Sequence, residues 1–521
     1  MRTMTDLIDQ PFGTIPALIR SHAQTRGACI ALHDGDQAID YASLDAQMDC
    51  VAAALQRDGI QAQQAIAICA ANSLAYAVVF LGALRAGIAV APLAPSAGAD
   101  SLCSMINDAR AQLLFVDTDA AAMLDEATSP ASIRRILLDM HEETTAATSL
   151  AHWLDDAATP APVDAQPDWA FNIIYSSGTT GTPKGIVQAN AMRWTHMQRG
   201  TFAGYGPESV TMIATPLYSN TTLVSFFPTL ALGGCAVVMA KFDAATYLLL
   251  AARFKVTHSM LVPVQYMRLL AHADFDRTDL SAFQMKFCTS APFAALLKAD
   301  VLRRWPGGLV EYYGMTEGGG TCVLQAHLYP HKLHTVGQSA PGHDVRLIDE
   351  DGVEVGAEVT GEVVGHSPAM MQGYFGQPDK TAEAEWFAPD GKRFIRTGDL
   401  GRFDADGFLT LMDRKKDMII SGGFNIYPSD LEALLVQHPA VAEAAVVGVT
   451  SARWGETPVG FIVLKELIER DELLHWINQK VGKIQRLATL QFVAELPRSA
   501  IGKVLKRDLR TRFADQFGDV P

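Results

Sequence analysis

The sequence predicts an α/β protein: a large N-terminal domain of two α/β layers, a small β-barrel-like subdomain, and a small α+β C-terminal domain. Two observations carry this prediction. From about Tyr41, amphipathic helical segments alternate with short apolar strands, which is the pattern of parallel sheets covered by helices. Past Gly337 the alternation gives way to β-hairpin patterns with strong turn signals.

The alternating part of the sequence contains the two layers. In the first, residues 42–59 predict a helix, residues 64–70 a buried strand, and residues 74–87 a helix that Gly87 ends. The pattern resumes after an Ala- and Pro-rich stretch near residues 157–167. Strands of the second series are expected at 171–176, 210–215, 235–240, 257–263, 284–290 and 309–314.

The remaining third of the sequence is richer in turns. Asp351-Gly352 and Asp406-Gly407 are dipeptides typical of tight hairpin turns. Further on, Ser429 and Glu432 have the spacing of a capping box before the apolar helical segment 431–438. We therefore expect an N-terminal domain of residues 1–414, whose β-rich subdomain spans about 337–414, and a C-terminal domain of residues 415–521.

Composition and charge exclude several classes of protein. The 521 residues carry a formal net charge of -15, which argues against a nucleic-acid partner because phosphate backbones are bound by Lys and Arg. The seven cysteines form no C-x-x-C pair, as expected for reduced thiols in a cytoplasmic protein. The N-terminus lacks the apolar core of a signal peptide, and Arg85 and Gly87 interrupt the most apolar run. We expect no membrane span.

Residues 176–185, SSGTTGTPKG, have the composition of a phosphate-binding loop and follow an apolar strand. The glycines let the backbone approach an anion, the hydroxyl groups donate hydrogen bonds, and Lys184 adds a positive charge. The loop is not a Walker A loop, because the G-x-x-x-x-G-K-[ST] pattern is missing. A flexible surface loop is the alternative, which the density of donors at a strand end disfavours.

Four further segments follow in a fixed order: Tyr312 to Glu317 (YYGMTE), Arg396 to Asp399 (RTGD), Asp413 to Asp417 (DRKKD) and Pro497 to Lys503 (PRSAIGK). With the glycine-rich loop, they resemble the signature motifs of the adenylate-forming superfamily. That superfamily includes acyl-CoA synthetases, nonribosomal peptide adenylation domains and firefly luciferase, and the chain is most similar to carboxylic acid–CoA ligases. The resemblance covers nearly the whole chain. It implies ATP, Mg²⁺ and coenzyme A as cofactor and co-substrates, a small-molecule carboxylic acid as substrate, and a mobile C-terminal domain. It leaves a homodimer open.

The resemblance also implies roles for individual residues, and their chemistry suits these roles. Tyr313 can stack on a purine, Glu317 is a hard oxygen ligand for Mg²⁺, Asp399 can accept bonds from ribose hydroxyls, and Arg414 can donate to the sugar or phosphate. Lys503 places a positive charge where the transition state builds up negative charge. Taken singly, these residues would more often be a core tyrosine, surface charges or a surface ion pair.

The residues implied in nucleotide binding and catalysis form one set. Nucleotide binding is expected at Ser176, Ser177, Gly178, Thr179, Thr180, Gly181, Thr182, Lys184, Ser290, Ala291, Pro292, Glu311, Tyr312, Tyr313, Gly314, Met315, Thr316, Asp399, Arg414 and Lys503. Catalysis is expected of Lys503, Thr180, Lys184 and Glu317, and metal binding of Glu317 and Thr180. Ile501 departs from relatives, which often carry Ser or Thr there.

A second set concerns the acid and the thiol. The acyl pocket is expected at Tyr218, Ser219, Asn220, Val264, Gln265, Thr289, Gly314, Gly318, Gly319 and Gly320. Coenzyme A binding is expected at Ser421, Gly422, Gly423, Phe424 and Trp454, with the domain hinge at Lys416; for Trp454 an ordinary half-buried position is the alternative.

The expected acid is aromatic or a medium-sized aliphatic one. Gly318 to Gly320 remove side-chain volume beside the pocket, unless the backbone conformation itself requires glycine. Ser219 departs from the His of many acyl- and aryl-CoA ligases. An amino-acid-activating enzyme is disfavoured, because residues 217–220 lack the Asp that holds the amino group in such relatives. The prediction is an acid–CoA ligase that works through an acyl-adenylate. The alternatives are an enzyme that loads a separate carrier protein and a non-catalytic nucleotide-binding relative.

Overall fold

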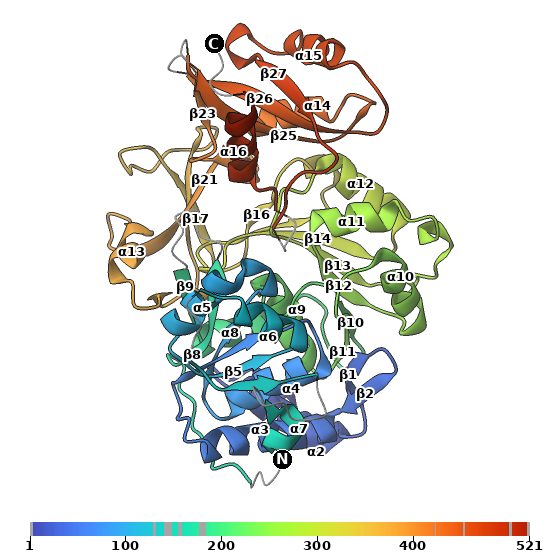
Figure 1. Ribbon diagram of the computed structural model, residues 1–521, viewed down its shortest axis with the longest axis vertical. Coiled ribbons are helices and arrows are strands. Elements are labelled where there is room, and N and C mark those ends of the chain that lie inside the picture. The colour runs from blue at the N-terminus through green and yellow to red at the C-terminus, as the bar shows by residue number, and fades with distance from the viewer. Residues whose placement is uncertain are drawn as a thin grey trace. The chain divides into compact units, whose positions relative to one another are not determined.

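Parallel strands flanked by helices make up the greater part of the protein in the computed structural model (Figure 1). The structure describes residues 4–128, 132–139, 148–154, 159–176, 184–421, 424–451, 454–499 and 503–517. The chain divides into two units. The first comprises Met1–Leu333, Ala340–Asp344 and His366–Ile395; the second comprises His334–Ser339, Val345–Gly365 and Arg396–Pro521.

One sheet of the first unit has the order β19-β9-β8-β4-β3-β5-β6-β7. Its strands are β3 (Ala65–Cys69), β4 (Ala89–Pro92), β5 (Ala111–Val116), β6 (Arg135–Leu137), β7 (Thr148–Ser149), β8 (Ala170–Ser176), β9 (Lys184–Ala189) and β19 (Gly373–Tyr374). The strands from β8 to β7 are parallel, while β9 is antiparallel to both β8 and β19.

The other sheet of the first unit contains β15-β14-β13-β12-β10-β11-β1-β2 in that order. Its strands are β1 (Ile30–Asp34), β2 (Gln37–Asp40), β10 (Val210–Ile213), β11 (Cys235–Val238), β12 (His258–Leu261), β13 (Met285–Cys288), β14 (Gly308–Tyr313) and β15 (Cys322–Gln325). All neighbours from β14 to β1 are parallel, so their carboxyl ends lie along one edge, where open α/β sheets bind ligands.

Helices cover both sheets and fill the space between them. They are α1 (Met4–Ile8), α2 (Ile15–Arg26), α3 (Tyr41–Arg57), α4 (Leu74–Arg85), α5 (Ala99–Asp108), α6 (Thr118–Asp125), α7 (Leu150–Leu154), α8 (Asn190–Gly200), α9 (Asn220–Ala231), α10 (Ala244–Arg253), α11 (Pro263–Leu270), α12 (Ala295–Arg304) and α13 (Pro378–Glu383). Helices α2, α3, α4 and α9 share one hydrophobic core with strands of both sheets. Nearly every side chain of α4 is therefore buried, which explains its apolar sequence.

Several sequence predictions for these elements are confirmed. Helix α4 ends as expected: Gly87 has a φ of 70°, and the Ile88 N–H donates to the Ala83 carbonyl at 3.0 Å. The turn glycines Gly352 and Gly407 both have a φ of 78°.

None of the helices in the described ranges combines the length and the apolar composition that a membrane span requires.

The second unit continues with β-rich structure. Strands β17 (Asp344–Ile348), β18 (Gly361–His366) and β21 (Arg393–Phe403) are neighbours in one sheet, and β22 (Leu409–Arg414) pairs with β21. Strand β20 (Glu385–Phe387) pairs with the first residues of β21, within the first unit. The short strand β16 (Gln338–Ser339) precedes β17.

The C-terminal part of the second unit has its own sheet and core. The strands are β23 (Ile419–Ser421), β24 (Phe424–Ile426), β25 (Val441–Ser451), β26 (Gly455–Leu464) and β27 (Thr489–Phe492), with the helices α14 (Pro428–Leu435), α15 (Arg470–Asn478) and α16 (Lys506–Phe517). The order is β24-β23-β26-β25, and β27 runs parallel to β26. The predicted α/β fold, with a large N-terminal and a small C-terminal domain, is thus confirmed.

The predicted capping box at Ser429 and Glu432 is wrong. Helix α14 already begins at Pro428, and the Ser429 hydroxyl donates to the carbonyl of Met412 instead. The Glu432 carboxylate accepts a hydrogen bond from the Val446 N–H at 2.7 Å and pairs with Lys506 at 2.8 Å. Both side chains therefore bind partners outside the helix, and their three-residue spacing does not form a capping box.

A buried ion pair links α12 to β14. Lys298 and Glu311 contact each other, and their side chains are only 2% and 5% exposed. We expect Lys298→Met to destabilise the protein by about 3–5 kcal/mol, because the buried Glu311 carboxylate would lose the positive charge that it pairs with. Equilibrium denaturation measures this loss, and Lys298→Met combined with Glu311→Leu should recover much of it. A loss below about 1 kcal/mol for the single variant would contradict the role of this pair.

Candidate active site

The predicted phosphate-binding loop connects two antiparallel strands. Ser176, the last residue of β8, lies opposite Lys184, the first residue of β9, in the ladder of the two strands. The two residues that flank the loop therefore lie directly opposite each other. Most of its predicted residues, Ser177, Gly178, Thr179, Thr180, Gly181 and Thr182, lie outside the described residues.

Glu317 lies close to Lys184 through a shared neighbour. The Tyr374 hydroxyl donates a hydrogen bond to Glu317 Oε1 at 2.9 Å, and Lys184 Nζ lies 5.1 Å from the centre of the Tyr374 ring. Burial, together with the Glu317 carboxylate, raises the pKa of Tyr374, so the phenol keeps its proton and remains the donor. One tyrosine thus gathers a carboxylate and an ammonium group from separate segments.

The residues present suit a Mg²⁺ ion that arrives with a nucleotide. Among the described residues there is no cluster of three or more His, Cys, Asp or Glu side chains able to hold a metal ion. Mg²⁺ is usually bound by one or two carboxylates together with substrate phosphates, not by an all-protein cage. The half-buried Glu317 carboxylate, fixed at one oxygen by Tyr374, fits this donor set.

Strand β14 carries three predicted nucleotide-binding residues, which differ in their surroundings. The Glu311 carboxylate is committed to its ion pair with Lys298. Tyr312 packs against Phe287 with ring centres 5.9 Å apart, and burial raises its pKa to about 12. Tyr313 is half-buried and pairs with Cys322 of β15. Gly314, which follows directly, is exposed.

The predicted acyl-pocket segments meet at the carboxyl ends of β10, β12 and β13. Ser290 has a φ of 79°, a strained conformation for a residue with a side chain, and its Oγ lies 2.5 Å from Thr221 Oγ1. Ala291 and Pro292 follow directly. Tyr218, half-buried, and Ser219, buried, stand just before α9, and Asn220 begins that helix.

Two side-chain amides hold the backbone of these segments. Asn72 donates to the carbonyls of Thr215 and Met239, both at 3.0 Å, and accepts from the Leu217 N–H at 2.7 Å. Gln265 donates to the Ala214 carbonyl at 2.9 Å and accepts from the Val262 N–H at 3.1 Å. Gln265 therefore orients the backbone of the predicted pocket segments with both ends of its amide. Val264 and Thr289, its predicted companions, are half-buried.

Gly318 is glycine for a conformational reason. Its φ is 78°, and a Cβ atom there would lie 1.9 Å from the Ala369 carbonyl oxygen. The Ser367 hydroxyl donates to the Gly318 carbonyl at 2.7 Å and fixes this close approach. Of the two explanations for the glycine run, the conformational one applies at Gly318. Gly318 therefore carries no information about the size of the predicted acyl pocket. Gly319 and Gly320 are buried.

Four predicted residues of the second unit form one electrostatic group. Asp399 of β21 lies opposite Arg414 of β22, and their side chains pair at 3.1 Å. Burial lowers the pKa of Lys503 to about 8; nearby Arg414 and Lys416 lower it too, while Asp399 and Asp417 oppose them. The loop that carries Lys503 is closed by the Leu505 N–H, which donates to the Pro497 carbonyl at 2.8 Å.

The described residues of the predicted coenzyme A segment lie at one end of the C-terminal sheet. Ser421 is buried and pairs with Phe424 in the hairpin and with Gly455 of β26. Phe424 is 58% exposed, and Trp454, the residue before Gly455, is 42% exposed. Gly422 and Gly423 lie outside the described residues.

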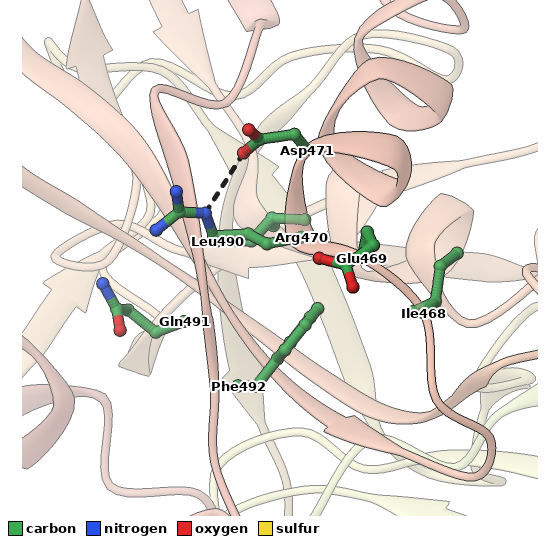
Figure 2. Close-up of a pocket in the computed structure, with 7 residues that line it drawn as sticks. All are labelled: Ile468, Glu469, Arg470, Asp471, Leu490, Gln491 and Phe492. Carbon is green, nitrogen blue, oxygen red and sulfur yellow. Dashed lines mark hydrogen bonds and ion pairs between the residues drawn. The ribbon is translucent and has the colours of Figure 1, made fainter.

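A surface depression elsewhere in the second unit contains none of the predicted site residues. Figure 2 shows its lining by Ile468, Glu469, Arg470, Asp471, Leu490, Gln491 and Phe492. The Arg470–Asp471 ion pair in its wall is exposed on both sides, 56% and 84%. It therefore offers no buried polar group to a ligand.

The sequence reasoning did not single out Tyr374, Gln188 or Thr221. Tyr374 lies in a two-residue strand, where no periodicity is visible. Gln188 offered a signal, because it is a fully buried polar residue that directly follows the apolar Ile186 and Val187 in β9. Thr221 directly follows the predicted pocket residues 218–220.

Residues 19–375 match the family of AMP-binding enzymes, and residues 430–503 match the AMP-binding enzyme C-terminal domain. The chain belongs to the AMP-binding enzyme family. A feruloyl-CoA synthase of Amycolatopsis sp is 31% identical over 490 residues, which cover 93% of this chain and 96% of the relative. An indoleacetate–CoA ligase of Aromatoleum aromaticum is 30% identical over 95% of this chain and 97% of the relative.

The solved structures agree with these matches. The ATP-bound crystal structure of MatB from Rhodopseudomonas palustris is 28% identical and superimposes with a TM-score of 0.86, covering 96% of this chain and 99% of the other. The predicted superfamily is confirmed. This AMP-binding enzyme belongs to the adenylate-forming acid–CoA ligases.

The environment of Lys503 leads to a direct test. Burial and the two neighbouring cations disfavour the charged amine, so it should lose its proton near pH 8, about two units below an ordinary lysine. Competitive labelling of the intact protein with an amine-reactive reagent, followed by peptide mass spectrometry, gives the labelling rate at each pH. The Lys503 peptide should show an inflection near pH 8, whereas a lysine of ordinary pKa is labelled increasingly up to about pH 10. Identical profiles would contradict the described environment.

Proposed function

We propose that this AMP-binding enzyme activates an aromatic or medium-sized aliphatic carboxylic acid with ATP and transfers the acyl group to coenzyme A. One observation carries the first part of the proposal. Lys184 and Glu317 lie beside the same tyrosine, where the predicted phosphate-binding loop rejoins the sheet. A cation and a hard carboxylate at this point suit a triphosphate and its metal ion.

In the first half-reaction, a carboxylate oxygen of the acid attacks the α-phosphorus of ATP. The bond from that phosphorus to the bridging oxygen breaks, and pyrophosphate leaves. Glu317 would hold Mg²⁺, which neutralises part of the phosphate charge. Lys184 adds charge to the same phosphates, and Lys503 stabilises the charge that grows on the α-phosphate. Asp399 accepts hydrogen bonds from the ribose.

In the second half-reaction, the thiolate of coenzyme A attacks the carbonyl carbon of the acyl-adenylate. The bond from this carbon to the phosphate oxygen breaks, AMP leaves, and a thioester remains. We assign the segment Ser421 to Phe424 and Trp454 to the thiol-bearing arm, because Phe424 and Trp454 expose apolar surface at one sheet end. Lys416 serves as the hinge about which the C-terminal domain rotates between the two half-reactions.

The names of the relatives favour an aromatic acid. The feruloyl-CoA synthase and the indoleacetate–CoA ligase, each similar over more than nine-tenths of this chain, are both named for aromatic acids. Ser290 and Thr221 add hydroxyl groups to the predicted pocket, which suits a ring that carries polar substituents.

A panel of acids tests the reaction class and the substrate together. Purified protein with ATP and Mg²⁺ should release pyrophosphate with its preferred acid, and AMP and thioester should accumulate only when coenzyme A is added. Hydroxycinnamic and arylacetic acids should react faster than hexanoic or octanoic acid. Steady release of ADP would contradict the mechanism, and turnover with a carrier protein but not with coenzyme A would identify the other acceptor.

Substitution of Lys503 separates the two half-reactions. We expect Lys503→Ala to lower the rate of acyl-adenylate formation by about 10²–10³, because it removes a charge from the transition state. Thioester formation from supplied acyl-adenylate should stay within a fewfold of wild type. Lys480→Ala, at an exposed lysine of the same domain, serves as the matched control and should change neither rate. Equal loss in both half-reactions would refute the role of Lys503.

A further inference from the structure

Helix α8 buries an arginine that the mechanism does not use. The Arg193 side chain is fully buried, with 1% of the residue exposed, and no carboxylate among the described residues pairs with it. Burial lowers its pKa to about 9, so the guanidinium remains charged at neutral pH. Burying an unpaired charge costs several kcal/mol, which makes an ordinary packing role a poor explanation.

Amide oxygens and aromatic rings compensate the charge. Arg193 Nε donates to Asn172 Oδ1 at 2.9 Å, and Nη2 donates to Gln188 Oε1. The rings of Phe171 and Phe227 lie 5.7 and 5.9 Å from the guanidinium carbon. These contacts come from β8, β9 and α9, and β8 and β9 are the strands that flank the predicted phosphate-binding loop.

The guanidinium determines which way the Gln188 amide points. An arginine can only donate hydrogen bonds, so the Gln188 atom that faces it has to be the oxygen. Asn172 Nδ2 donates to the same oxygen at 3.0 Å. The Gln188 NH₂ group therefore faces the other way, where it donates to the Thr316 carbonyl at 2.7 Å and lies 3.4 Å from Asn220 Oδ1.

The hydrogen bond from Gln188 to the Thr316 carbonyl joins the two halves of the candidate phosphate site. Gln188 and Lys184 belong to the same strand, β9, and Thr316 directly precedes Glu317. The next two carbonyls of that segment are also held: the Met371 N–H donates to Glu317 O, and the Ser367 hydroxyl to Gly318 O, both at 2.7 Å. The Gln188 bond ties the segment directly to the strand of Lys184.

We propose that Arg193 is a positioning residue: by fixing the orientation of the Gln188 amide, it holds the Thr316–Glu317 segment at the right distance from Lys184 for metal and phosphate binding. The inference rests on the proposed function, in which Glu317 holds Mg²⁺. Arg193 itself touches neither substrate nor metal.

The test compares Arg193→Met, Arg193→Lys and Gln188→Leu with wild type. A matched control is Lys286→Met, because Lys286 is also fully buried and its Nζ donates to three backbone carbonyls, of Trp305, Pro306 and Gly307. Both Met variants should lose comparable thermal stability. Only Arg193→Met and Gln188→Leu should raise the Mg²⁺ concentration for half-maximal pyrophosphate release, by roughly tenfold, with the KM for the acid within about twofold of wild type.

Hydrogen exchange of the protein without substrates gives a readout that does not depend on activity. Amides of the peptide spanning residues 315–320 should exchange faster in Arg193→Met and Gln188→Leu than in wild type. In Lys286→Met their exchange rates should be unchanged. Arg193→Lys keeps the positive charge and a donor group that can face the Gln188 oxygen, so its effects on both readouts should be smaller than those of Arg193→Met. The double variant Arg193→Met with Gln188→Leu should be no worse than Gln188→Leu alone in the Mg²⁺ requirement, because Arg193 acts through that amide.

The outcomes separate this inference from the proposed function. A wild-type protein that releases no pyrophosphate with any acid refutes the proposed function, whatever the exchange data show. The positioning role is refuted if the wild type does release pyrophosphate, while Gln188→Leu and Arg193→Lys leave both the Mg²⁺ requirement and the hydrogen exchange unchanged. Equal shifts in Lys286→Met would also refute it, since the effect would then follow from lost stability alone.

Discussion

Buried backbone carbonyls at the carboxyl ends of the strands need hydrogen-bond donors, and in the first unit three side-chain amides meet this need. Asn72 binds the carbonyls that follow β10 and β11, Gln265 binds Ala214, and Gln188 binds Thr316. Regular secondary structure ends at these positions, so no neighbouring strand can supply the donors. A side-chain amide offers a donor and an acceptor on one short arm, and it thereby fixes irregular backbone that would otherwise be free to move. The geometry of the candidate site depends on these bonds.

The first unit buries charged groups and compensates them in two different ways. The Lys298–Glu311 pair and the Arg193 guanidinium are both buried, yet they are compensated differently, one by an opposite charge and the other by amide oxygens and rings. An arginine facing a carboxylate would leave little field for its surroundings, whereas one facing amides polarises them. The Gln188 NH₂ group, at the far end of such an amide, becomes a stronger donor to the Thr316 carbonyl. This is a physical reason to place an arginine, and not an apolar residue, at that position.

The sequence predicted regular elements well and long-range contacts poorly. The helix that ends at Gly87 and the turns at Gly352 and Gly407 follow from local rules, because a positive φ favours glycine wherever the chain lies. The superfamily and its ordered motifs were equally visible. Ser429 was misread, since its partner Met412 lies 17 residues away. For Gly318 the sequence left pocket volume and backbone conformation as alternatives, because the restricting atom belongs to the distant Ala369. Tyr374 and Gln188 gain their roles only when β9 and β19 bring them beside Glu317 and Thr316.

Lys503 illustrates how surrounding cations can favour the proposed reaction. Within its own unit the amine lies near Arg414 and Lys416, and burial adds to their repulsion, so the charged form is disfavoured there. A triphosphate brings several negative charges, which reverse this balance and favour a fully protonated amine. In the proposed reaction, the free energy lost by crowding these cations would be regained when the nucleotide binds, and most strongly when the α-phosphorus carries additional charge. Crowded cations of this kind would stabilise the transition state more than the bound substrates, which is the condition for electrostatic catalysis.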